Sequence, residues 1–275
     1  AWLVGDEGRG VRTIIDMVGC TRLDCAAGTS TLMRKALVEA GHHVSHRSAF
    51  GALLVDQPLM RNVLADLAVE SEAATSLTMR LAGATDRALG GDEQEQAFRR
   101  IGTALGKYWI TKRGPAFTAE AMECLGGNGY VEESGMPRLY REAPLNSIWE
   151  GSGNVNALDV LRALGREPVV ADVLMHEIGL GTGANRHLDA AVDQLGADLA
   201  AATADLASIE FRARRLVEQM ALTLQGSLLV RHSTPAVADA FCSSRLGGQG
   251  GLSFGTLDVG VDTAAILERA LPDAS

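Results

Sequence analysis

A single carboxylate stands in a turn built from apolar and small residues. Glu150 follows Ile148 and Trp149 and precedes Gly151 and Ser152. One interpretation is structural, because a carboxylate just before a helix stabilises the exposed backbone N–H groups by about 0.5–1 kcal/mol. The other is catalytic, because burial disfavours the charged form of a carboxylate and so makes it a better proton acceptor. The turn by itself leaves both interpretations open.

A glycine-rich run, Gly126-Gly127-Asn128-Gly129, is a second candidate for chemistry. Between two helices it can be a plain turn, since glycine accepts positive φ angles without strain. It can equally allow backbone N–H groups to approach a ligand phosphate closely. The run alone does not decide between a turn and a phosphate contact.

Histidine and cysteine spacing argues against a metal site. His42 and His46 lie one helical turn apart, a spacing used for zinc, yet no Glu follows His42 and no third ligand is near. No Gly-x-Ser-x-Gly motif is present, so a serine hydrolase has no support. The cysteines form no CxxC pair and are expected to be reduced core thiols: Cys20, Cys25, Cys124 and Cys242.

Charge and composition restrict the classes of partner. The 275 residues carry a formal net charge of −9, the pI is about 5.2, and 47% of the residues are apolar. We therefore expect a soluble cytoplasmic protein without an extended nucleic-acid surface. No apolar run reaches the ~18 residues that a membrane span needs. The basic cluster Arg212-Ala213-Arg214-Arg215 is interpreted as a solvated helix face, because residues 165–275 hold 8 Arg and no Lys against 14 acidic residues, a net of −6.

Helices must position these residues, because apolar side chains recur at helical spacing along most of the chain. Thr234 before Pro235 is expected to cap a helix, and no strand is predicted except the end of one in the first few residues. Long helices joined by short connections pack as antiparallel bundles, so the expected fold class is all-α. The expected helices cover residues 11–46, 57–89, 92–124, 137–143, 155–164, 168–179, 184–204, 208–230, 235–246 and 261–270.

Several motifs in order and spacing resemble the C-terminal four-helix bundle of acyl-CoA dehydrogenases, over residues 9–165. They are Arg47-Ser48-Ala49-Phe50-Gly51, Leu64-Ala65-Asp66, Leu125-Gly126-Gly127-Asn128-Gly129-Tyr130, Arg141 and Trp149-Glu150-Gly151-Ser152. Four segments are similar to the AidB-like branch of that family: Thr21–Ala26, Gln57–Arg61, Arg138–Glu142 and Asn146–Asn154. That branch carries an additional C-terminal helical domain, which would account for residues 166–275. Residues 1–8 would be the tail of a β-domain that this chain lacks, so we expect a C-terminal portion of such an enzyme.

The resemblance implies a role for each matching residue. Glu150 matches the base that removes the α-proton of an acyl-CoA while FAD accepts a hydride. In a second branch of the family the base lies on the first long helix, but here that neighbourhood is Cys20-Thr21-Arg22 and holds no carboxylate. Arg141 is expected to form an ion pair. The implied flavin contacts are Ser152 and Asn154 near the ribityl and diphosphate groups, and Gly126, Gly127, Arg47 and Phe50 near the dinucleotide, the last two reaching a neighbouring subunit's flavin.

The resemblance also implies partners and leaves alternatives. Expected partners are an acyl-CoA substrate, an electron-transfer flavoprotein as acceptor, and three further copies in a homotetramer. Two positions depart from the usual family pattern, Pro58 and Glu123, and the acidic Glu123 would repel a diphosphate. One alternative is a DNA-associated alkylation-response protein with vestigial dehydrogenase activity, which the acidic residues 165–275 disfavour. Another is an interaction module whose bundle only builds the tetramer.

Overall fold

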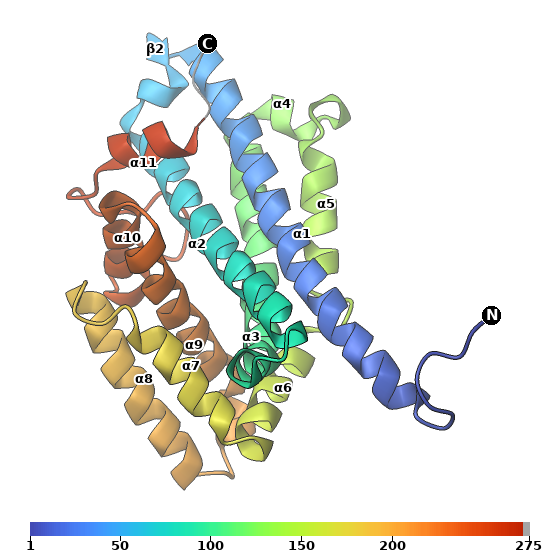
Figure 1. Cartoon of the computed structure of the whole chain (residues 1–275). Coiled ribbons are helices and arrows are strands. Elements are labelled where there is room, and N and C mark those ends of the chain that lie inside the picture. The colour runs from blue at the N-terminus through green and yellow to red at the C-terminus, as the bar shows by residue number, and fades with distance from the viewer. Residues whose placement is uncertain (272–275) are drawn as a thin grey trace.

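Three long helices form the centre of the molecule, as shown in Figure 1. The computed structural model describes residues 1–271. α1 spans Gly10–His46, α2 spans Pro58–Leu89 and α3 spans Glu93–Glu123. Pro58 opens α2 because its fixed φ suits the first helical position. The Asp92 side chain accepts hydrogen bonds from two backbone N–H groups of the first turn of α3. The three predicted helices are therefore confirmed to within about two residues at each end.

A short hairpin follows α1 and was not predicted. β1 (Ser48–Ala49) pairs antiparallel with β2 (Ala52–Leu53), and the two residues between them, Phe50 and Gly51, have φ angles of 53° and 84°. Positive φ at both central positions is what a tight hairpin turn requires. Two-residue strands are too short to show an alternating pattern in a sequence. The first four residues, where the end of a strand was expected, form none.

Short elements connect α3 to the predicted catalytic turn. A one-turn helix, α4 (Gly127–Tyr130), and a 3-10 turn, η2 (Glu132–Ser134), lead to α5 (Met136–Asn146) and, after the turn, to α6 (Gly153–Arg166). The glycine run ends the long helix as predicted, but it then forms a helical turn of its own. Gly129 is required there, because a Cβ atom would lie 2.1 Å from a carbonyl oxygen of α3.

The C-terminal part consists of shorter helices, and the predicted all-α fold class is confirmed. They are α7 (Val169–Gly179), α8 (Arg186–Ala204), α9 (Ile209–His232), α10 (Pro235–Phe241) with a π-helical turn at Cys242–Leu246, and α11 (Thr263–Ala270). Thr234 takes the extended N-cap backbone expected of it. Its hydroxyl group is nevertheless buried without a hydrogen-bond partner, so the predicted side-chain cap is wrong.

One continuous apolar cluster extends from α1 to α11. α9 packs against α2 and α3, and Trp109 Nε1 donates to Gln225 Oε1 at 3.0 Å across that contact. The helices on the two sides of the domain boundary predicted near Gly165 therefore share one hydrophobic core. Within residues 1–271 no helix is both long and apolar enough to cross a membrane.

Candidate active site

Glu150 lies in the turn between α5 and α6, with a φ of 55°, and its side chain is partly buried. It borders a pocket of about 470 Å³ between α1 and α5. A positive φ is uncommon for a residue with a Cβ atom and needs support from the surrounding structure. The pocket wall contains apolar and small residues together with polar ones, among them Cys25, Gly28, Leu32, Asn146 and Trp149.

Arg22 of α1 supports this turn. Its Nε donates to the Glu150 carbonyl oxygen at 2.9 Å, and its Nη1 donates to Asp159 Oδ2 at 2.7 Å. Asp159, on α6, also pairs with Arg100 and Arg162. Burial opposes ionisation of Asp159, but the neighbouring guanidinium groups outweigh it and lower the pKa of that carboxyl group. Arg22, which lies on α1 and is itself held by Asp159 of α6, therefore fixes the position of the Glu150 backbone.

Lys107 of α3 supports the next peptide group. Its Nζ donates to the carbonyl oxygen of Gly151, which also accepts from the Asn156 side chain. Lys107 is only 1% exposed, and this burial lowers its pKa to about 8. The sequence analysis missed this residue. The available signal was a lysine within the otherwise apolar run from Leu105 to Ile110.

Two further carboxylates, Asp24 and Glu142, line the same pocket as Glu150. Asp24 lies on α1 only three residues beyond Thr21, which also lines the pocket. The first long helix therefore does bring a carboxylate to this site, contrary to the expectation drawn from Cys20-Thr21-Arg22. Glu150 differs from both in the strained backbone that carries it.

The start of α6 gathers cationic and polar groups. Ser152 precedes the helix and is exposed, and the Asn154 side-chain oxygen accepts from Arg214 Nε of α9 at 2.8 Å. A Cβ atom on Gly153 would lie 2.8 Å from the Lys112 side chain and 3.2 Å from Arg214 Nη2, so both cations approach the backbone of this residue closely. Arg214 thus contacts a predicted flavin residue while it remains exposed on α9, as the interpretation of a solvated helix face requires.

The other predicted flavin contacts lie at the far end of α1. Arg47 follows the last residue of α1, 25 residues beyond Arg22, which places it about 37 Å further along the helix axis. In Figure 1 the hairpin that holds Phe50 and the helix α4 that follows Gly126 lie at this same end. Arg47 and Phe50 are exposed, and Gly126 and Gly127 have open space around them. The structure therefore divides the predicted flavin residues into two separate groups.

Three other predictions concern polar side chains. His42 and His46 stack with ring centroids 4.5 Å apart, and the described residues contain no cluster of three metal-binding side chains. Arg141 forms a two-point ion pair with Glu132 at 2.8 and 3.0 Å, as predicted. All four cysteines are free, but Cys20 is exposed and is therefore not the core thiol that was expected.

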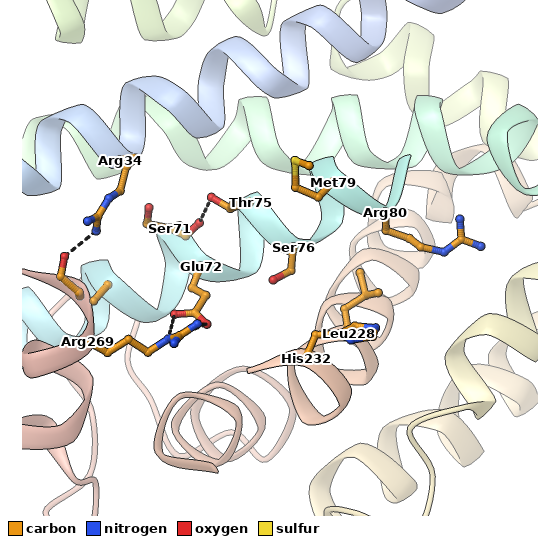
Figure 2. A pocket seen from close by; sticks show the side chains of 12 residues that line it. Arg34, Ser71, Glu72, Thr75, Ser76, Met79, Arg80, Leu228, His232 and Arg269 are labelled. Carbon is orange, nitrogen blue, oxygen red and sulfur yellow. Dashed lines mark hydrogen bonds and ion pairs between the residues drawn. The ribbon is translucent and has the colours of Figure 1, made fainter. Parts of the chain in front are cut away.

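A second pocket, of about 600 Å³, lies away from Glu150 where α11 meets the bundle (Figure 2). Arg269 of α11 donates from Nε and Nη2 to the Glu72 carboxylate of α2. Arg34 of α1 donates to the Ala270 carbonyl oxygen at 2.6 Å. Two of the cationic side chains that line this pocket are thus engaged in fastening the last helix to α1 and α2.

Comparison with known proteins adds sequence and fold relatives. The family model described as acyl-CoA dehydrogenase, C-terminal domain, matches residues 8–165. The putative acyl-CoA dehydrogenase AidB of Escherichia coli K12 is 43% identical over 251 residues, which cover 91% of this chain and 45% of AidB.

Two solved structures share the fold. Caenorhabditis elegans ACDH-11 in complex with C11-CoA matches with a TM-score of 0.80 at 28% identity, over 88% of this chain and 45% of that one. A Bacillus anthracis acyl-CoA dehydrogenase complexed with FAD matches with a TM-score of 0.70 at 18% identity, over 88% and 49% of the two chains. This chain spans just under half the length of these relatives. Because the family model covers more than half of its residues, the chain belongs to the acyl-CoA dehydrogenase family.

Proposed function

We propose that this chain is the C-terminal part of an FAD-dependent acyl-CoA dehydrogenase of the AidB-like branch, with Glu150 as the base. The observation that carries the proposal is the Glu150 turn: a carboxylate at the rim of a pocket, on a strained backbone held by Arg22 and Lys107. Such a backbone is typical of functional residues, because strain persists only where the surroundings over-determine it.

An acyl-CoA is the proposed substrate. The relative ACDH-11 was solved with C11-CoA. In this chain the pocket offers apolar wall atoms from Leu32 and Trp149, which suit an acyl chain. Asn146 Nδ2 is buried in the same wall without a hydrogen-bond acceptor, so it is available to an oxygen atom of a ligand.

The residues at the start of α6 fit the phosphate groups of FAD. Lys112 and Arg214 converge on Gly153 at the positive end of a 14-residue helix, and no carboxylate of the described residues lies within 4 Å of either cation. Ser152 offers an exposed hydroxyl group, and the Asn154 amide group keeps its N–H donors while its oxygen faces Arg214. These residues would hold the cofactor on the side of α6 that adjoins Glu150.

The proposed reaction is α,β-dehydrogenation. The Glu150 carboxylate takes the proton from the carbon next to the thioester carbonyl, and Arg22 keeps the carboxylate at a constant position by holding its backbone. FAD, when bound, supplies the acceptor for the hydride that leaves the β-carbon. An electron-transfer flavoprotein is the proposed next acceptor, and the cytoplasm is the proposed compartment.

We also propose a homotetramer in which one subunit completes another's flavin site. Arg47 and the 96%-exposed Phe50 lie about 37 Å along α1 from the contact that Arg22 makes with Glu150. One site of ordinary size does not extend over that distance. Arg47, Phe50, Gly126 and Gly127 are therefore assigned to a flavin held by a neighbouring subunit, and Ser152 and Asn154 to the flavin beside Glu150.

The Glu150→Gln variant tests the base. In the flavin-loaded protein we expect the variant to retain FAD but to reduce it at least about 10²-fold more slowly when acyl-CoA is added, because general-base removal typically costs this much. Stopped-flow bleaching of the flavin absorbance measures the rate. Asp24→Asn and Glu142→Gln are compared in the same assay. Undiminished bleaching in Glu150→Gln, with loss in Asp24→Asn, would assign the base to α1 instead.

A further inference from the structure

We propose that Lys107 is the positioning residue of this site: its side chain holds the Gly151 carbonyl oxygen and thereby keeps Glu150 in its catalytic conformation. The inference rests on the proposed role of Glu150 as the base. It assigns to a buried α3 lysine a task distinct from that of Arg22, which holds the preceding carbonyl group.

The geometry of the turn carries the argument. Glu150 and Gly151 both have positive φ, 55° and 100°, so two consecutive peptide groups are turned into the left-handed region. Each of their carbonyl oxygens receives a cationic donor from a different helix, Arg22 from α1 and Lys107 from α3. Loss of Arg22 removes the side-chain donor of the Glu150 carbonyl oxygen, and loss of Lys107 leaves the Gly151 carbonyl oxygen with the neutral Asn156 amide alone. Either loss weakens the support of the backbone that carries the Glu150 side chain.

The burial of Lys107 indicates that its role is more than structural. No carboxylate of the described residues lies within 4 Å of its Nζ, although the side chain is 1% exposed. A buried cation without a paired carboxylate destabilises a fold, so stability does not explain its presence. Its hydrogen-bond acceptor is the catalytic turn itself.

The same burial makes this support dependent on pH. The pKa of Lys107 is lowered to about 8, first by desolvation; Arg22 and Lys112 also lower it, whereas Cys25 and Glu150 raise it. Above this pH the amine is neutral and donates a weaker hydrogen bond to Gly151. We therefore expect the turn to loosen in mildly alkaline solution.

The first experiment needs neither flavin nor substrate. The chain is labelled with 5-fluorotryptophan, and the Trp149 resonance is assigned by its disappearance in Trp149→Phe. We expect its ¹⁹F shift to titrate with a midpoint of about 8 in the wild type and to lose this transition in Lys107→Met. Persistence of the same transition in Lys107→Met would overturn the proposal. The buried Trp109 resonance is the internal reference.

The second experiment uses the flavin-loaded protein and a matched control. Thr103→Val removes another buried polar group, one helical turn earlier on α3, whose hydroxyl has no partner. We expect Lys107→Met to lower the limiting rate of flavin reduction by about tenfold, with KM nearly unchanged and Tm not lowered. Thr103→Val should keep the wild-type rate. A rate loss in Lys107→Met that only parallels a fall in Tm would show a purely structural role.

These two readouts separate the inference from the proposed function. If the wild-type protein does not reduce its flavin with any acyl-CoA, the proposed function fails, while the ¹⁹F titration still reports whether Lys107 controls the turn.

Discussion

Two residues other than glycine have positive φ in the described part of the chain, and both are predicted site residues. Glu150 lies beside a pocket, whereas Phe50 is exposed at the tip of the hairpin. For Phe50 the turn explains the φ angle locally, since a tight hairpin demands it. For Glu150 the support comes from Arg22, 128 residues away in sequence, and from Lys107, which holds the next residue, Gly151, from 44 residues away. Strain held by distant residues is the stronger indication of function.

The lowered pKa of Lys107 also predicts how the free energy of unfolding depends on pH. Its folded-state pKa, about 8, lies below its ordinary value of 10.5, so between these values the unfolded chain binds more protons. The free energy of unfolding then rises with pH across this window. Lys107→Met removes the effect. We expect the variant to be more stable than the wild type at pH ~7, by about 2–3 kcal/mol at most, and this advantage to shrink towards pH ~10.

Urea denaturation of both proteins at several pH values measures this difference. Using the difference cancels the titration of cysteines and tyrosines that both proteins share. A stability gap that stays constant from pH ~7 to ~10 would contradict the lowered pKa of Lys107.

The sequence identified the residues that lie within motifs and missed those that contact them from elsewhere. Glu150, Ser152 and Asn154 form a local pattern that can be recognised along the chain. Lys107 and Arg214 join the site only because α3 and α9 pack beside α6. Such contacts depend on helix packing, which no spacing rule within one segment reveals.

At the scale of elements, a buried ionic cluster fastens the C-terminal loop to α2. Asp66 accepts from Arg245 of the π-helical turn and from the backbone N–H of Gly255 at 2.9 Å. Glu70, one turn later, pairs with Arg245 and Arg113. Burial opposes ionisation of Glu70, but the two guanidinium groups outweigh it and lower the pKa of its carboxyl group.

Asp66→Asn should therefore be strongly destabilising. The variant leaves Arg245 with one carboxylate instead of two and weakens the anchor of residues 247–257, at a cost of about 3 kcal/mol. Urea denaturation measures the loss, and hydrogen exchange should show the Gly255 amide opening first. Glu39→Gln, which breaks the exposed Lys35–Glu39 pair, is the control and should cost less than about 1 kcal/mol. Equal effects of the two substitutions would contradict an anchoring role.

Helix boundaries were predictable because they depend on local signals. Pro58 and the Asp92 cap mark the starts of α2 and α3, and apolar periodicity gives the lengths. The hairpin at Ser48–Leu53 and the unpartnered hydroxyl of Thr234 were not predictable. The strands of the hairpin are too short to show an alternating pattern in the sequence. Whether the Thr234 hydroxyl group finds a partner depends on the residues that pack over it.

On the scale of the whole molecule, the helices of residues 166–271 pack against the first bundle. α9 packs against α2, α3 and α6, and Glu177 of α7 binds Arg80 of α2 and Arg231 of α9 together. The apolar cluster continues through all of these helices. This packing suits the proposed catalytic role, because α9 also places Arg214 beside Asn154 at the start of α6.

The charge of the same C-terminal part bears on the alternative DNA-associated function. Residues 165–275 carry a net charge of −6. Within the basic cluster, Arg212 pairs with Asp205 and Arg214 donates to Asn154, which leaves Arg215 as the exposed cation without such a contact. A protein that neutralises six or more phosphates loses about 10³-fold in affinity between about 50 and 200 mM salt. The two exposed arginines of this cluster, Arg214 and Arg215, do not provide that many contacts.

We therefore expect no salt-dependent binding of double-stranded DNA by this chain. Fluorescence anisotropy of a labelled duplex, at about 50 and about 200 mM salt, measures it. If affinity is found at the lower salt and disappears at the higher one, Arg215→Ser shows whether α9 is the contact. Weakened binding in that variant would establish a nucleic-acid surface on α9 despite the acidic net charge. Absence of binding even at the lower salt leaves α9 with the role that its contacts indicate, holding the start of α6 beside Glu150.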